Sequence, residues 1–198
     1  MPTNRLQTIR EQPCSAPHCV RLGRGRYCAH HRSLYRHYGA PVVGPDKQLL
    51  LVHQRYLRKT LEPLVADDGE TQRLIREIAD SAFGPRPVHF QDGRGRVRQA
   101  AYEAVAGQVE RIRQCHPRET NRELAERLWW AFLTVQFVEM NNVFVHQDRH
   151  HFWTSVIRLL ITDTHRQKPS SRYADYLNDR LNKLLSAPAA AWCSKVEL

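Results

Sequence analysis

The sequence predicts a mainly α-helical protein, in which a small cysteine-rich module at the N-terminus is joined to an α-helical domain. Three observations support this fold class. Three of the five cysteines lie within residues 14–28, a stretch rich in glycine and proline follows at residues 39–46, and apolar residues beyond it recur at helical spacing. The chain has 198 residues, of which 41% are hydrophobic, so it is long enough to bury a core. We therefore expect a basic arm and module over residues 1–41 and a helical domain over residues 46–198.

The first predicted helix covers residues 29–38, because Gly39 and Pro41 follow it directly. In the second domain, Asp46 is a candidate N-cap for a helix over residues 47–61. One face of this helix is expected to carry its apolar residues, together with one histidine: Leu49, Leu50, His53, Tyr56, Leu57 and Leu61. The same periodicity predicts helices over residues 70–83 and 97–114.

A capping-box spacing at Thr120-Asn-Arg-Glu123 predicts the start of a long helix. This helix is apolar on every face, which is typical of a helix at the centre of a core. A helix-turn-helix within residues 97–140 is the alternative, but Trp129 and Trp130 favour a core role. Two further helices are predicted over residues 149–164 and 171–185, followed by a tail that is either frayed or docked through Trp192.

The composition indicates a protein of the cytoplasm. No apolar run approaches the roughly 20 residues that a membrane-spanning helix needs. The first 14 residues contain no apolar segment typical of a signal peptide. We therefore expect no membrane partner, and cysteine thiols that stay reduced.

The positive charge is concentrated at the N-terminus. The formal net charge is +10 and the isoelectric point is about 9.8. Residues 1–38 carry seven arginines against a single acidic residue, Glu11, and thus hold six of the ten excess charges. A genome that prefers arginine codons would explain the excess of arginine over lysine, but it would not explain the clustering. Such a segment favours a polyanionic partner, either nucleic acid or an acidic protein.

The cysteines have the spacing Cys14-x4-Cys19-x8-Cys28-x2-His31. Three thiolates and one imidazole suit tetrahedral Zn²⁺, and four protein ligands leave no open position for water, as in structural sites. His31 lies about one helical turn after Cys28, whereas His30, the competing ligand, is expected to point off that face. A chance cluster and redox chemistry are the alternatives. A disulfide would leave one of the three cysteines unpaired, and no Cys-x-x-Cys pair is present.

Residues 12–41 resemble the small Cys-x4-Cys-x8-Cys-x2-His zinc modules of bacteriophage and mobile-element proteins, which often accompany HNH-type endonuclease domains. The shared features are the four candidate ligands, Tyr27 before the third cysteine, the basic helix containing Arg32–Arg36, and the closing Gly39-x-Pro41. The resemblance implies one zinc ion and nucleic-acid binding, and a phage origin would place the protein in the cytoplasm of a bacterial host. It does not extend to residues 45–198.

We expect nucleic acid, and DNA in particular, to contact the arginines and one tyrosine of the module together with a second Gly/Arg-rich stretch: Arg21, Arg24, Arg26, Tyr27, Arg32, Arg36, Arg94 and Arg96. In the alternative interpretation, Tyr27 and Leu34 form a small core and the arginines are a solvated face. A second alternative is an adaptor or inhibitor that binds an acidic host protein. In the nucleic-acid-binding interpretation, the helical domain would supply dimerisation or partner recognition.

An enzymatic function has one candidate site, the segment containing His146, Asp148 and His150. Histidine and aspartate can hold a divalent ion, and a histidine can act as a general base in a metal-dependent nuclease. The order and spacing of these residues do not fit an HNH motif. A corner between two helices, with Asp148 as an N-cap, is the simpler interpretation, and we therefore expect a non-enzymatic protein.

Overall fold

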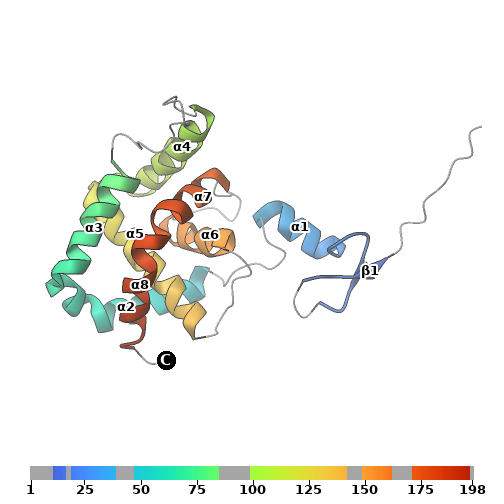
Figure 1. The fold of residues 1–198 in the computed structure, drawn as a ribbon, viewed down its shortest axis with the longest axis horizontal. Helices are drawn as coiled ribbons and strands as arrows, with labels where there is room; N and C mark the ends of the chain where they lie inside the picture. Colours follow the sequence, from blue (N-terminus) through green and yellow to red (C-terminus); the bar gives the residue numbers. More distant parts are fainter. Residues whose placement is uncertain are drawn as a thin grey trace, which may run out of the picture. The chain divides into compact units, whose positions relative to one another are not determined.

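The computed structural model describes residues 11–16, 19–38, 47–84, 99–141, 149–161 and 171–196. It divides the chain into two compact units, Met1–Val43 and Gly44–Leu198, and the described part contains eight helices and a two-stranded sheet (Figure 1). The mainly α-helical class predicted from the sequence is confirmed. Among the described residues, no helix has both the length and the apolar character needed to cross a membrane.

The first unit combines a short antiparallel ribbon with one helix. Strand β1 (Gln12–Pro13) pairs with β2 (Leu22–Gly23), so that Gln12 lies opposite Gly23 and Pro13 opposite Leu22. Helix α1 spans Ala29–Tyr38, the range predicted from the sequence. Apart from the cysteines, this unit buries few apolar side chains, with Ala16 and the half-buried Tyr27 packed against the cysteine cluster.

The second unit consists of seven helices among the described residues. They are α2 (Lys47–Asp67), α3 (Gly69–Ala82), α4 (Gln99–Cys115), α5 (Asn121–Met140), α6 (Arg149–Leu160), α7 (Ser171–Arg180) and α8 (Asn182–Cys193). Helix α5 runs through the middle of the unit and packs against α2, α3, α6 and α8 (Figure 1).

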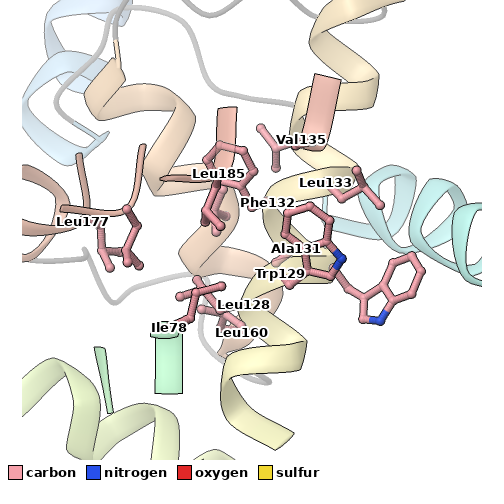
Figure 2. Packing of buried hydrophobic residues seen from close by; sticks show 14 of the residues in the cluster. Ile78, Leu128, Trp129, Ala131, Phe132, Leu133, Val135, Leu160, Leu177 and Leu185 are labelled. Atoms are coloured by element: carbon pink, nitrogen blue, oxygen red, sulfur yellow. The ribbon is translucent and has the colours of Figure 1, made fainter. Parts of the chain in front are cut away.

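The central position of α5 follows from its sequence. The capping box at its start is formed, since the backbone N–H of Glu123 donates to Thr120 Oγ1 and the Glu123 carboxylate accepts from the Thr120 N–H. Trp129, Trp130 and Phe132 are fully buried, which confirms the core role over the recognition-helix alternative. Side chains from the neighbouring helices, including Ile78, Leu160 and Leu185, converge on this helix (Figure 2).

Helix α2 differs from its prediction in its length and in which of its faces is buried. It continues past Leu61 to Asp67, although Pro63 lacks the N–H that would bond to a carbonyl one turn earlier. Burial of Val65 in the core offsets part of that cost. The buried face is Leu50, Leu57, Leu61 and Val65, whereas two residues predicted on the core face, Leu49 and Tyr56, are 40% and 42% exposed.

The C-terminal region also departs from the prediction of one helix over residues 171–185. The helix breaks at Leu181, and α8 then continues to Cys193 despite Pro188. The break redirects the chain so that Trp192, which is 7% exposed, reaches α3 and donates its indole N–H to Thr71 Oγ1 at 3.1 Å. The tail is therefore docked through Trp192, one of the two outcomes expected.

Other boundaries follow the predictions closely. Asp68 caps α3 by accepting from the Thr71 N–H at 2.8 Å. Helix α4 begins at Gln99, two residues after the predicted start, and helix α6 ends at Leu160 rather than at Thr164. The predicted cap at Asp46 and the long break at residues 85–98 lie outside the described residues.

Candidate metal centre

Backbone hydrogen bonds bring the predicted ligands together. Cys14 follows β1 directly, and its N–H donates to the Arg21 carbonyl at 3.0 Å. The N–H of Ser15 donates to the Arg26 carbonyl at 2.9 Å, which draws the first ligand toward the loop before Cys28. Cys28 immediately precedes α1, so His31 lies in the first turn of that helix.

The four side chains converge on one point. Their ligand atoms, three sulfurs and one imidazole nitrogen, all lie within 4.8 Å of one another. His31 Nδ1 is 3.3 Å from Cys14 Sγ and 3.5 Å from Cys28 Sγ, and Cys19 Sγ is 4.0 Å from Cys28 Sγ. Tetrahedral coordination with ordinary zinc bond lengths places sulfur atoms about 3.8 Å apart and sulfur about 3.6 Å from nitrogen. The separations therefore fit four ligands around a single metal ion.

The choice between the two histidines is clear from the geometry. His31 contributes Nδ1 to the cluster, whereas His30 is exposed and is not part of it. In the portion of the chain that the structure describes, no other group of three or more histidine, cysteine or acidic side chains comes together in this way.

The environment of Cys14 favours its thiolate form. Burial alone would raise the pKa of Cys14, but hydrogen bonds from the backbone of Cys28 and Ala16, then from His31 and Cys19, lower it to about 6. The N–H of Cys28 lies 3.2 Å from Cys14 Sγ, at the start of α1, where helix N–H groups favour a thiolate. For Cys19, the backbone N–H of Arg21 acts to lower the pKa. Burial and the neighbouring thiols outweigh it and raise the pKa. A cation would relieve this mutual repulsion.

Gly23 is a further residue on which the geometry of the cluster depends. Its position is so close to the third ligand that a Cβ would lie 2.6 Å from Cys28 Cα and 2.6 Å from the Tyr27 carbonyl oxygen. Only glycine allows β2 to approach the start of α1 at this distance. Gly25 has a different role, since its φ of 98° lies in the left-handed region that favours glycine in turns. In the sequence, the two glycines of the Leu-Gly-Arg-Gly-Arg segment are the signal that the backbone here needs conformations open to glycine.

The arginines of the module fall into two groups. Arg21, Arg24 and Arg26 are exposed, and Arg24 forms a long ion pair with Glu11, at 4.0 Å between side chains that are more than half exposed. Arg32 is half-buried, and its guanidinium donates to the Tyr27 carbonyl at 3.5 Å. Arg21, Arg24 and Arg26 are thus accessible to a partner, whereas Arg32 makes a hydrogen bond within the module.

Tyr27 has a structural role as well as an exposed edge. It packs against the cysteine cluster, its ring lies 5.5 Å from that of Tyr35, and the Arg26 guanidinium lies 5.3 Å from its centroid. Leu34, in α1, is half-buried, but it is not among the residues that pack against the cysteine cluster. The interpretation in which Tyr27 belongs to a small core of the module is therefore supported in part.

Several predicted residues lie outside what the structure describes. The backbone of Arg36 is in α1 and that of His150 is in α6, but their side chains are not described. Arg94, Arg96, His146 and Asp148 belong to segments outside the described residues. The second basic stretch and the nuclease segment remain predictions.

The two remaining cysteines serve the helical unit. Cys193 is buried, its thiol lies 3.6 Å from the Leu133 carbonyl oxygen, and burial raises its pKa to about 12. Cys115 is half-buried against the core. Neither belongs to the candidate metal cluster.

No protein-family model, curated protein or solved structure matches this chain. The Cys14/Cys19/Cys28/His31 cluster expected from the resemblance is present, without a family match beside it.

Proposed function

We propose that this is a non-enzymatic, zinc-containing protein that binds nucleic acid, DNA in particular, through the arginines of its N-terminal module. The observation that carries the proposal is the arrangement of that module. A four-ligand cluster organises the segment from within, and Arg21, Arg24 and Arg26 are exposed around it.

Zinc is the ion that best suits the donor set. Thiolate and imidazole are the ligands that Zn²⁺ prefers, and a site with four protein ligands is closed to substrate, as in structural zinc sites. The module buries few apolar side chains of its own. Metal binding would therefore supply much of the free energy that folds it.

Nucleic acid is the partner favoured by the exposed charge. Arginine presents a planar fork of donors that matches phosphate oxygens, and the module carries six of the ten excess positive charges of the chain within residues 1–38. The Arg24–Glu11 pair offers little competition, because exposed ion pairs contribute about 0–1 kcal/mol. The resemblance of residues 12–41 to modules of phage and mobile-element proteins is the sole basis for proposing that origin, and with it the cytoplasm of a bacterial host.

The experiment is a binding titration on labelled duplex DNA across a range of salt concentrations, with the zinc content measured on the same sample. Replacing Arg21, Arg24 and Arg26 by alanine should weaken binding and reduce the salt slope by about 2–3, at roughly 0.9 per phosphate contact. A matched control removes three exposed arginines of the helical unit, Arg73, Arg76 and Arg111. The proposal fails if both triple variants lose affinity equally or if the wild type binds no nucleic acid.

The second candidate function is an adaptor that binds an acidic host protein through the basic face of the module, where Arg21, Arg24 and Arg26 are exposed. The exposed apolar face of α2 is a separate surface, on the helical unit. Leu49, Val52 and Tyr56 are 40%, 57% and 42% exposed and recur at helical spacing. Such a face suits dimerisation or partner recognition by the helical unit. An adaptor should capture one acidic protein after nuclease treatment, and a homo-oligomer should appear in sedimentation of the purified chain.

A further inference from the structure

The ribbon of the N-terminal module has an apolar face that is exposed to water. Val20 is 97% exposed and Leu22 is 59% exposed. Pro13, which lies directly opposite Leu22 in the β1–β2 ladder, is exposed as well. Cross-strand partners project from the same side of a ribbon, so Pro13 and Leu22 form one patch. Val20 lies just before β2 in the chain and is also exposed.

Among the described residues of the module, packing does not account for this patch. Gly23, the neighbour of Leu22, is buried against Tyr27 and Cys28 and therefore marks the side of the ribbon that faces the metal centre. Successive residues of a strand point to opposite sides, so Leu22 points away from the cluster. Val20 and Leu22 are thus not part of the cluster that the described residues of the module bury.

The charges around the patch indicate what it would contact. Arg21 lies between Val20 and Leu22 in the chain, Arg24 lies two residues after Leu22, and both are exposed. A ligand that contacts both the arginines and the apolar side chains needs negative charge and an apolar surface close to each other. In duplex DNA the base faces are covered by stacking, and a protein reaches base edges and phosphates. An unpaired strand offers phosphates together with free base faces.

We infer that the apolar patch of Pro13 and Leu22, together with the exposed Val20 that precedes β2, contacts unpaired bases, and that the module therefore binds single-stranded nucleic acid more tightly than duplex. The inference rests on the proposed function and specifies its substrate class. In this arrangement, Arg21 and Arg24 hold phosphates while Val20 and Leu22 lie against base faces.

The test measures fluorescence anisotropy of a labelled mixed-sequence DNA oligonucleotide, as a single strand and annealed to its complement, with wild-type protein and the double variant Val20→Ser/Leu22→Ser. Both side chains are exposed, so the variant should keep its zinc, which is measured on the same samples. The matched control, Leu49→Ser/Val52→Ser, makes the same chemical change on the exposed face of α2.

We expect the wild type to prefer the single strand. The module variant should lose about tenfold in affinity for the single strand, with duplex affinity unchanged, and the control should lose neither. Equal affinity of wild type and module variant for the single strand would overturn the inference, as would a wild-type preference for duplex. A module variant that instead changes the sedimentation of the free protein would also overturn it and assign the patch to a protein contact. If the wild type bound neither form of DNA, the proposed function itself would fail, which is a separate outcome.

Discussion

The substitution Gly23→Ala tests how the module holds its metal. A Cβ at this position would lie 2.6 Å from Cys28 Cα, 2.6 Å from the Tyr27 carbonyl oxygen and 2.7 Å from Cys28 N, whereas ordinary contacts begin at 3.4 Å. The obstructing atoms belong to the backbone, which cannot rotate away as a side chain would. Strand β2 and the start of α1 must therefore separate by about 0.8 Å, the difference between 3.4 and 2.6 Å.

That displacement exceeds what the metal site tolerates. Metal–ligand distances vary by about 0.2 Å in well-formed sites, and disturbing the residues that support the ligands typically costs about 10–100-fold in metal affinity. We expect a loss of that size for Gly23→Ala. The assay is competition for zinc between the full-length protein and a chromophoric chelator of known affinity.

The control is Gly107→Ala, because a Cβ there would meet no atom within 4 Å. It lies in α4, where alanine replaces glycine in a helix and should stabilise the protein by about 0.5–1 kcal/mol with unchanged zinc affinity. If Gly23→Ala retained the zinc affinity of the wild type, the close approach of β2 to Cys28 would not be a determinant of the site, and the reasoning would be refuted.

Three further predictions concern the helical unit. Thr120→Ala removes the capping box of α5 and should lower the free energy of unfolding by about 1 kcal/mol in thermal denaturation, with no change in zinc content. Trp192→Phe removes the indole N–H that donates to Thr71 Oγ1, and urea denaturation should show a loss of about 1 kcal/mol; an unchanged midpoint would contradict the docking of the tail. Burial raises the pKa of Tyr173 well above its ordinary value of 10.0, so the folded state keeps this phenol neutral while the unfolded chain ionises it. Stability should therefore fall as the pH rises above about 10, and Tyr173→Phe should lose less over the same interval.

The features predicted well from sequence are those set by neighbouring residues. Helix α1 ends where Gly39 and Pro41 follow it, and α5 begins at a capping box, because a few adjacent side chains decide both boundaries. The four candidate ligands were recognisable for the same reason, since their spacing in a short segment constrains which side chains can meet.

The features that were missed depend on contacts distant in sequence. The extension of α2 through Pro63 follows from burial of Val65 in the core, and the break at Leu181 allows Trp192 to reach Thr71 on α3. Neither partner is adjacent in the chain, so local propensity gave no sign of them. The need for glycine at position 23 arises likewise from the approach of two segments, which periodicity cannot reveal.

The most direct test of the account is the metal content of the purified full-length protein and of two histidine variants. Elemental analysis should find about one zinc ion per chain in the wild type and in His30→Ala, because His30 is exposed and lies outside the cluster. His31→Ala should lose most of the zinc, since it removes the only nitrogen among the four ligand atoms. A wild type without zinc, or a His31→Ala variant that holds as much zinc as the wild type, would contradict the central claim.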